Sequence, residues 1–560
     1  MAKAENIIII GGVAAGAAAA TRLRRINEKA TITIFEKSNY VSFANCGMPY
    51  YIGGEITNRQ RILLNTADFF KDRFNIDVMV NHEVTAINRK DKTLAVTDLT
   101  SRSRKGREKT VKYDKLLIAT GASHIVPEID GIDSSNVFAL RHILHMDKIK
   151  TFIETWRPEE TVIVGAGYIG IELAEQLKRI GSEVTIVEKS DQILPPLDKE
   201  MASIVEEYLI DNEVTVIKDD ALSELELEGE ETFVARKVKL ASGKELDSDM
   251  ILLSLGVRPN VELAKDAKIT IGETGAIKVN DKMQTSDPSI FAAGDVAESV
   301  HKVTGKNVWI PLAGPASFQG RVAGSVMGGK DAHYAGVTGT AIVRFNDIIA
   351  ANSGVNEKQA KAAKLSFFVS YSHSQSHATY YPGAAIEHIK LIVEKKTGRL
   401  LGAQVVGYDG VDKTIDIFAA TINSGGTVDD LVDLDLAYAP PYSSARSPVQ
   451  MAGMIAQNRL RNIDAAISAD DVIKKDYSVI DVRTQTEHDE DKIFEGSLSI
   501  PIDTLRDNIP ISMKTKKVAL LCRAGLRSYL AYRILKQAGF KDVKNINGGY
   551  LISRHILNDS

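Results

Sequence analysis

Short apolar runs alternate with helical patterns along most of the chain. The runs are rich in β-branched residues and are bounded by turn residues, which is typical of buried strands in βαβ units. Four of them, at 6–10, 31–35, 161–164 and 183–187, are predicted to be parallel strands. They form two units of the same layout about one domain apart, which indicates a duplicated nucleotide-binding fold rather than a short repeat.

The first apolar stretch, 7–20, admits a second interpretation as the core of a signal peptide. Its glycines and the arginines just after it favour a buried strand that runs into a phosphate loop and a helix. No run of about eighteen apolar residues occurs elsewhere, so no membrane-spanning segment is predicted.

The pattern changes after about residue 330. Strands followed by helix, with glycine and proline punctuation, extend to about 450, and 451–464 is expected to be a helical tail or linker. A compact α/β pattern resumes at Ser468, with strands at 477–481 and 518–521 and a helix from Ser528. The basic run 101–112 is interpreted as a solvated loop between strands.

Composition narrows the class of protein. A length of 560 residues allows roughly three to five domains, and 44% apolar with 25% charged residues is ordinary for a soluble globular protein. The net charge of −4 gives no basic field for nucleic acid. Two cysteines are too few for a disulfide framework, so a reducing, cytoplasmic location is expected.

The sequence contains two candidate phosphate-binding loops, and the second matches the known motif more completely. Gly165-Ala166-Gly167-Tyr168-Ile169-Gly170 follows a predicted strand as a full G-x-G-x-x-G, whose glycines allow a tight turn, close approach of a pyrophosphate and helix packing. Glu188 ends the next strand, where an acid binds a ribose 2′-hydroxyl, which favours NADH over NADPH. The neighbouring Lys189 leaves NADPH possible.

The first loop, 11–16, reads GGVAAG, with Val13 in place of the middle glycine. Alone this motif is weak. The order of strand, loop, helix and an acidic strand end at Glu36 nevertheless matches the second unit, and packing alone would not require that repetition.

Three further segments, YDKLLIATGA at 113–122, LGVRPN at 255–260 and TSDPSIFAAGD at 285–295, complete a resemblance. Over residues 1 to about 450 the chain resembles the pyridine nucleotide–disulfide oxidoreductase superfamily. The resemblance implies that the first loop and Glu36 hold the ADP half of FAD, that Asp295 holds the ribityl chain, and that Thr120-Gly121 marks the crossover between domains. The expected cofactor residues are Gly11, Val13, Ala14, Glu36, Lys37, Thr120, Gly121, Asp295, Ala313, Gly165, Gly167, Tyr168, Ile169, Glu188 and Gly256.

Cys46 lies in SFANCGMPY, just after the first unit. A lone cysteine is usually a small buried hydrophobe, but a position between a flavin site and a helix start favours a reactive thiolate of lowered pKa. Because no second cysteine is nearby, the chemistry must pass through a mixed disulfide, a persulfide or a sulfenic acid on this one sulfur.

The S-F-x-x-C-G-x-P-Y motif resembles the single-cysteine branch of the superfamily, which contains coenzyme A-disulfide reductases, persulfide reductases, NADH oxidases and NADH peroxidases. The peroxidases and oxidases generally carry a histidine in the first loop, which GGVAAG lacks. The coenzyme A branch is the better match, and it implies that Arg22, Arg25, Ser42 and Asn45 bind coenzyme A. Arginines suit phosphate; a helix with a solvated basic face is the alternative.

The same resemblance implies that two tyrosines, Tyr380 and Tyr438, are supplied by a partner subunit of a homodimer and protonate or orient the leaving thiolate. Tyr381 is a close rival to Tyr380, and packing in a core or interface is the alternative for all three. His373 and His377 are four apart, but no third ligand is near, so no metal site is expected.

Cys522 opens the loop CRAGLR between a predicted strand and helix, a place where backbone amides and arginines stabilise a thiolate and then a persulfide. With Asp481-Val482-Arg483 and Gly548-Gly549, this segment resembles rhodanese domains, in which Cys522 and Arg527 would be catalytic. The segment IFEGS at 493–497 departs from the His-Ile-Pro-Gly turn that is frequent in the family.

The expected fold is α/β, with two Rossmann-like dinucleotide-binding domains, an α+β dimerisation domain and a C-terminal α/β rhodanese domain. The expected boundaries are 1–115 and 246–328 for the two parts of the FAD-binding domain, 116–245 for the NAD-binding domain, 329–450 for the dimerisation domain, 451–467 for a linker and 468–560 for the rhodanese domain.

The expected activity is NADH-dependent reduction of S–S bonds in coenzyme A persulfide, coenzyme A disulfide or polysulfide, with FAD as cofactor and the rhodanese domain handling sulfane sulfur. An NADH oxidase that uses a cysteine sulfenic acid is one alternative, and a slow sulfur carrier or redox sensor is another.

Overall fold

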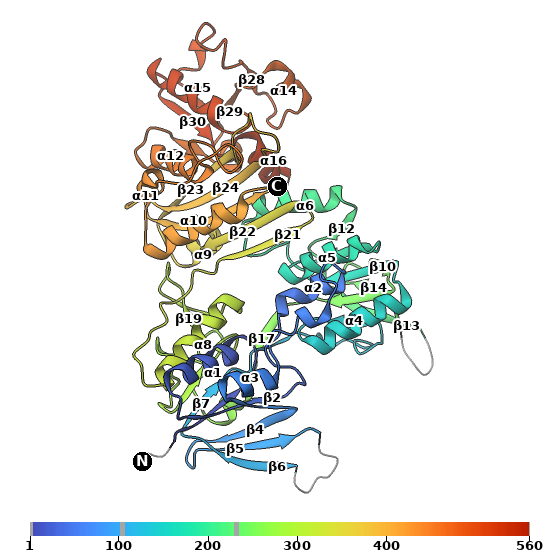
Figure 1. Cartoon of the computed structure of the whole chain (residues 1–560). Helices are drawn as coiled ribbons and strands as arrows, with labels where there is room; N and C mark the ends of the chain where they lie inside the picture. Colours follow the sequence, from blue (N-terminus) through green and yellow to red (C-terminus); the bar gives the residue numbers. More distant parts are fainter. Residues whose placement is uncertain (1–3, 101–106, 229–233, 559–560) are drawn as a thin grey trace. The chain divides into compact units, whose positions relative to one another are not determined.

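The computed structural model describes residues 4–100, 107–228 and 234–558. The chain divides into two compact units, 1–189 with 219–339 and 190–218 with 340–560. Figure 1 shows the helices and strands of each unit.

The first sheet of the first unit has five parallel strands in the order β18-β7-β1-β2-β3. The central strand β1 buries four consecutive isoleucines, Ile7 to Ile10, because both faces of a parallel sheet are covered. Helix α1 (Ala14–Ile26) packs closely on α8 (Ala313–Met327), where a Cβ at Gly320 would lie 2.2 Å from the Ala15 carbonyl oxygen. The strands are β1 (Asn6–Ile10), β2 (Thr31–Glu36), β3 (Asp77–Val80), β7 (Lys115–Ile118) and β18 (Ile290–Ala292).

The second sheet of this unit repeats the plan with parallel neighbours in the order β11-β10-β16-β9. Helix α5 (Tyr168–Arg179) follows β10 as α1 follows β1, and α4 (Ile143–Trp156) follows β9. Two small antiparallel sheets accompany the large ones. One is β4-β5-β6, where β4 is His82–Asn88, and the other is β13 (Leu222–Glu228), β14 (Val234–Leu240) and β15 (Glu245–Asp247). The strands of this sheet that belong to the first unit are β9 (Val137–Ala139), β10 (Glu160–Val164), β11 (Glu183–Val187) and β16 (Met250–Leu253).

The second unit begins its main segment with an antiparallel sheet in the order β21-β22-β25-β24-β23. Helix α10 (Val411–Ser424) packs on β22 and β25, and α12 (Pro448–Leu460) packs on β23 and β24 (Figure 1). The strands are β21 (Ala341–Phe345), β22 (Ile348–Gly354), β23 (Phe367–Gln375), β24 (Ile386–Glu394) and β25 (Leu400–Gly407).

The C-terminal part of this unit is a parallel sheet in the order β26-β30-β29-β27-β28. Helices α15 (Leu526–Gln537) and α16 (Gly549–Asn558) each follow a strand of this sheet. The strands are β26 (Ala466–Ile467), β27 (Ser478–Asp481), β28 (Leu498–Ser499), β29 (Lys517–Leu521) and β30 (Asp542–Ile546).

The four strands predicted for the two βαβ units are confirmed, and the expected fold class is confirmed. Of the basic run 101–112, the first six residues lie outside the described ranges, while Glu108–Lys112 is strand β6 rather than loop, since it pairs with β5 (Thr93–Asp98). The range 451–467 begins inside α12, whose apolar face is buried, so a packed helix fills much of the expected linker. The exact domain boundaries stay a prediction. Across the described ranges, no helix is long and apolar enough to cross a membrane.

Candidate functional site

The two phosphate loops have the same local geometry. Gly11 and Gly165 have φ angles of +94° and +109°, and a Cβ at either would lie 2.3 or 2.4 Å from a carbonyl oxygen of the strand end beside it. A Cβ at the last glycine of each loop would lie within 2.1 Å of the first glycine's carbonyl oxygen, so only glycine permits this helix-on-strand packing. A Cβ at Gly167 would meet open space, which is the room that a pyrophosphate requires.

Each loop is held by the acid at the end of the following strand. Glu36 accepts a hydrogen bond from the Gly12 amide at 2.9 Å, and Glu188 accepts one from the Ala166 amide at 2.8 Å. The two carboxylates therefore occupy equivalent positions at the mouths of the two loops, where a ribose of a bound dinucleotide would lie.

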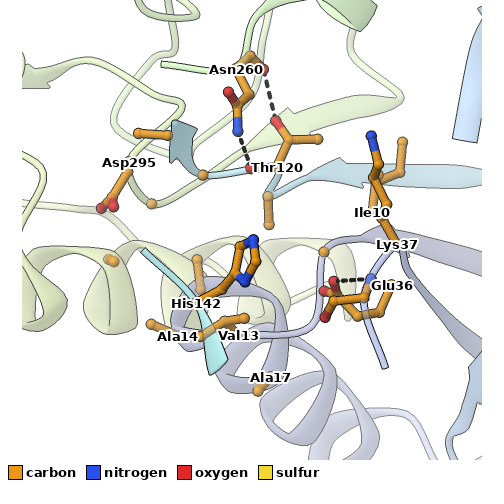
Figure 2. Close-up of a pocket in the computed structure, with 18 of the residues that line it drawn as sticks. Ile10, Val13, Ala14, Ala17, Glu36, Lys37, Thr120, His142, Asn260 and Asp295 are labelled. Atoms are coloured by element: carbon orange, nitrogen blue, oxygen red, sulfur yellow. Dashed lines mark hydrogen bonds between the residues drawn. The ribbon is translucent and has the colours of Figure 1, made fainter. Parts of the chain in front are cut away.

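A cavity of ≈ 1480 Å³ opens beside the first loop (Figure 2). Its volume is sufficient for a dinucleotide, and its lining combines backbone amides at the start of α1, which can donate, with hydroxyl groups and with carboxylates, which can accept. The Thr120 hydroxyl donates to the Asn260 carbonyl oxygen and the Asn260 amide donates to the Thr120 carbonyl oxygen, both at 2.8 Å (Figure 2). Asp295 pairs with Arg141 at 2.8 Å on the same wall.

The structure brings the sequence-predicted cofactor residues together in two groups. Those of the first group line the cavity: Gly11, Val13, Ala14, Glu36, Lys37, Thr120, Gly121, Asp295 and Ala313. Those of the second group surround the second loop at the ends of β10, β11 and β16: Gly165, Gly167, Tyr168, Ile169, Glu188 and Gly256.

Cys46 lies in the same cavity, in the short turn before helix α2 (Met48–Ile52). The expectation of a lowered pKa was wrong for the protein without bound cofactors. Partial burial raises the pKa of the Cys46 thiol, and the negative charges of Glu172 and Asp295 raise it further, while Arg141 opposes them. The helix that follows has five residues, too few for a strong dipole.

Glu172 is itself an unusual group. Burial raises its pKa to about 7, although the Tyr50 hydroxyl, which donates to it at 3.4 Å, acts in the opposite direction. It lies on α5, which packs on α2. A carboxyl that titrates near neutral pH therefore influences the charge of Cys46, and local sequence patterns gave no signal of this pairing.

The predicted coenzyme A residues fall into two pairs. Ser42 and Asn45 line the cavity with Cys46; the Ser42 hydroxyl accepts from Asn65 at 3.1 Å, and the Asn45 amide donates to the Arg141 carbonyl oxygen at 3.3 Å. Arg22 and Arg25 follow Thr21 on α1, which is itself a lining residue.

The neighbouring Arg24 turns inward instead. It is 4% exposed and donates to five backbone carbonyl oxygens. Of the three arginines in this stretch, Arg24 therefore has a structural role. Arg22 and Arg25 are less buried, and the Nε atom of each donates one hydrogen bond, to the Ser325 hydroxyl and to the Thr21 carbonyl oxygen.

Tyr380 and Tyr438 come together in the second unit. Their hydroxyls share a hydrogen bond of 2.8 Å, and this bond raises the pKa of Tyr380. Both side chains are exposed, at 74% and 48%. Tyr381 points elsewhere, with its ring edge-on to His377 at 5.7 Å between centroids.

Cys522 is 1% exposed at the end of β29. Its sulfur accepts a hydrogen bond from the Gly525 amide at 3.0 Å and lies 3.2 Å from the Ser528 hydroxyl. Gly525 has a φ of +104°, which turns its amide back toward the sulfur. One backbone amide of the expected cradle, that of Gly525, thus contacts the sulfur, and Ser528 is a further contact that the sequence reasoning did not assign.

Arg527 lies on the same loop, but its guanidinium is already engaged. It makes two hydrogen bonds to Glu487, of 2.6 and 2.7 Å. These bonds hold the pKa of Glu487 at about 2. Arg527 therefore reaches the Cys522 site as one half of a fixed ion pair.

Comparison with known proteins settles the family. Residues 5–320 match the family described as pyridine nucleotide-disulphide oxidoreductase, residues 340–467 match its dimerisation domain, and residues 464–551 match the rhodanese-like domain. The chain belongs to the pyridine nucleotide-disulphide oxidoreductase family. FAD and NAD(P)H are the cofactors of this family, and the two loop sites described above fit them.

Three relatives of this oxidoreductase bear on its chemistry. The NAD(P)H coenzyme A polysulfide/persulfide reductase of Pyrococcus horikoshii is 36% identical over 80% of this chain and 97% of its own. The structure of reduced Bacillus anthracis CoADR-RHD is 40% identical, with a TM-score of 0.95 over 100% of this chain and 99% of that one. The structure of an NAD-dependent persulfide reductase from A. fulgidus is 39% identical, with a TM-score of 0.90 over 98% and 99%.

Proposed function

We propose that this oxidoreductase uses NAD(P)H and FAD to reduce S–S bonds of coenzyme A persulfide, coenzyme A disulfide or polysulfide at Cys46, while Cys522 handles sulfane sulfur. The observation that carries the proposal is the placement of the chain's two cysteines. One lines the cofactor cavity without a second cysteine, and the other accepts a backbone amide hydrogen bond in a rhodanese-like domain. The printed names of the relatives agree with this chemistry.

At Cys46 the thiolate would attack the outer sulfur of a coenzyme A persulfide. The S–S bond of the substrate breaks, coenzyme A leaves as thiolate, and Cys46 becomes a persulfide. FAD, when bound, would pass an electron pair from NAD(P)H to this sulfur. Hydrosulfide then leaves and Cys46 returns to thiolate, so the sum is persulfide, NAD(P)H and a proton giving coenzyme A, hydrogen sulfide and NAD(P)⁺.

With coenzyme A disulfide the same attack would leave a mixed disulfide on Cys46. Two electrons and two protons then give two coenzyme A thiols. Ser42 and Asn45 would position the pantetheine arm, while Arg22 and Arg25 would bind the phosphates at its other end. Because Glu188 holds the ribose position of the second loop, we favour NADH as donor.

We further propose a homodimer in which Tyr380 and Tyr438 serve the partner subunit's Cys46 as proton donors. The support is their shared hydrogen bond at the protein surface, in the segment that matches the dimerisation domain. Such exposed aromatic side chains are typical of an interface. A cytoplasmic location is also a proposal; it rests on two cysteines that both need to stay reduced to act.

The test is anaerobic NADH oxidation by the purified yellow protein with coenzyme A persulfide and coenzyme A disulfide in parallel. Cys46→Ser is expected to abolish both reactions while FAD stays bound, and Cys522→Ser to abolish sulfur transfer from thiosulfate while disulfide reduction continues. Turnover retained by Cys46→Ser would overturn the assignment. No turnover with either substrate, but rapid NADH consumption once oxygen is admitted, would identify an NADH oxidase instead.

A further inference from the structure

Three histidines gather on one wall of the cofactor cavity, and neither the phosphate motifs nor the cysteines account for them. His124 ends strand β8 (Ala122–His124), His142 directly precedes α4, and His145 lies in the first turn of that helix. All three line the cavity. The His145 ring lies 3.7 Å from that of His142 and 5.3 Å from that of His124, measured between centroids.

The three rings share the same burial pattern of their nitrogens. Each ring buries its Nδ1 atom, and that atom has no hydrogen-bond partner within the described residues. A buried N–H without an acceptor costs more than a bare ring nitrogen, so the tautomer with hydrogen on Nε2 is favoured. The Nε2–H groups are then the donors that remain for a ligand of the cavity that these residues line.

The position of these histidines indicates which part of a bound ligand they contact. In Figure 2 the His142 ring projects into the cavity above Val13 and Ala14, where helix α1 starts. The amides at that helix start are the expected place for the pyrophosphate of a dinucleotide. Arg141 adds a positive charge on the same side.

We propose that His142, His145 and His124 form a second phosphate-binding wall of the FAD site, opposite the first glycine-rich loop. They donate from Nε2 to pyrophosphate oxygens that the loop amides contact from the other side. The proposal rests on the flavin cofactor of the family and is independent of which sulfur compound is reduced.

The charges around the rings fit this role. Burial lowers the pKa of all three rings. The neighbouring histidines lower the pKa of His142 and His145 further, and nearby cations lower each of the three, so the rings are neutral near pH 7. Asp295, Glu262 and Asp266 are acids of the same cavity, with Asp295 paired to Arg141. A neutral ring with hydrogen on Nε2 donates to a phosphate oxygen without placing an unpartnered N–H at the buried Nδ1, so the rings bind pyrophosphate in their neutral form.

The experiment removes FAD from the purified protein and measures rebinding by the quenching of FAD fluorescence. His145→Phe keeps the ring stack and removes the nitrogens, and His142→Asn keeps a residue that caps a helix well. Each is expected to weaken FAD binding about tenfold. The matched control is His333→Phe, because His333 pairs with Asp281 and Asp331 outside the cavity, and its FAD affinity should stay at the wild-type value.

ADP distinguishes phosphate contacts from a structural role, because it carries the pyrophosphate without the flavin. The proposal requires His142→Asn to weaken ADP and FAD binding by similar factors while the melting temperature of the FAD-free protein is unchanged. Wild-type affinity in both cavity variants, or weakened FAD binding with normal ADP binding, would overturn it. None of these readouts depends on turnover, so failure here is distinct from failure of the proposed activity.

Discussion

The hydroxyls of Tyr380 and Tyr438 share a hydrogen bond of 2.8 Å at the protein surface. One hydroxyl must donate and the other accept, so removing either hydroxyl breaks the hydrogen bond and leaves the pair with one proton fewer to transfer. We expect Tyr380→Phe and Tyr438→Phe each to lower kcat for coenzyme A disulfide by about 10²-fold. The double variant should lose little more than either single one, because the two hydroxyls act as a unit.

Tyr381→Phe is the matched control for this pair. Its ring lies against His377 and it is the neighbour of Tyr380 in sequence, so it reports on packing in the same segment. Near-wild-type kcat is expected. A loss in Tyr381→Phe equal to that in Tyr380→Phe would contradict the assignment of the proton donor to Tyr380.

The charge of Cys46 should respond to Glu172. The carboxylate raises the pKa of the thiol, so Glu172→Gln is expected to lower it and to shift thiolate formation toward lower pH. The measurement is the pH dependence of the thiolate–flavin charge-transfer absorbance, or of alkylation by iodoacetamide. Because burial puts the pKa of Glu172 at about 7, the effect should be large at pH 8 and small at pH 6, where the wild-type carboxyl is mostly neutral.

Glu183→Gln is the control for this experiment, since Glu183 is exposed at the start of β11 and is not among the groups that shift the pKa of Cys46 or Glu172. Its thiol titration should match that of the wild type. An unchanged titration in Glu172→Gln would show that the two groups are not coupled.

The sequence predicted those parts of the site that are encoded locally. Strands such as Asn6–Ile10 are buried on both faces, so their apolar runs are continuous, and the turns at Gly11 and Gly165 admit only glycine. Cys46 and Cys522 stood out because each lies within a short motif. These features depend on neighbours in sequence, which is why periodicity and motif spacing were sufficient.

The features of the site that the sequence did not predict are formed by residues far apart in the sequence. Glu172 affects Cys46 only because α5 packs on α2, and the wall of His124, His142 and His145 forms only when β8 meets the start of α4. The sign of the pKa shift of Cys46 was wrong for the same reason, since the burial that raises this pKa, and the carboxylates of Glu172 and Asp295 that add to it, come from tertiary packing.

Arg527 depends on Glu487 for its position. The two parallel hydrogen bonds fix the guanidinium plane beside the Cys522 loop, so Glu487→Gln is expected to lower kcat/KM for sulfur transfer from thiosulfate by about tenfold, equivalent to about 1.4 kcal/mol. Glu490→Gln, on the same short helix and exposed, should keep the wild-type value. A Glu487→Gln variant as active as the wild type would mean that the loop alone positions Arg527.

Lys390 supplies the stability prediction. Its side chain is fully buried, and its ammonium lies 2.8 Å from Asp198 and 2.7 Å from Glu357, with Glu200 also in contact. Lys390→Met would leave these carboxylates close together without a counter-charge, so we expect a loss of about 3–5 kcal/mol of stability. The control is Lys361→Met, because Lys361 pairs with the same Glu357 but is 68% exposed, and such surface pairs contribute about 0–1 kcal/mol. Urea unfolding of the two variants measures the difference, and equal midpoints would show that the buried ammonium does not stabilise the second unit.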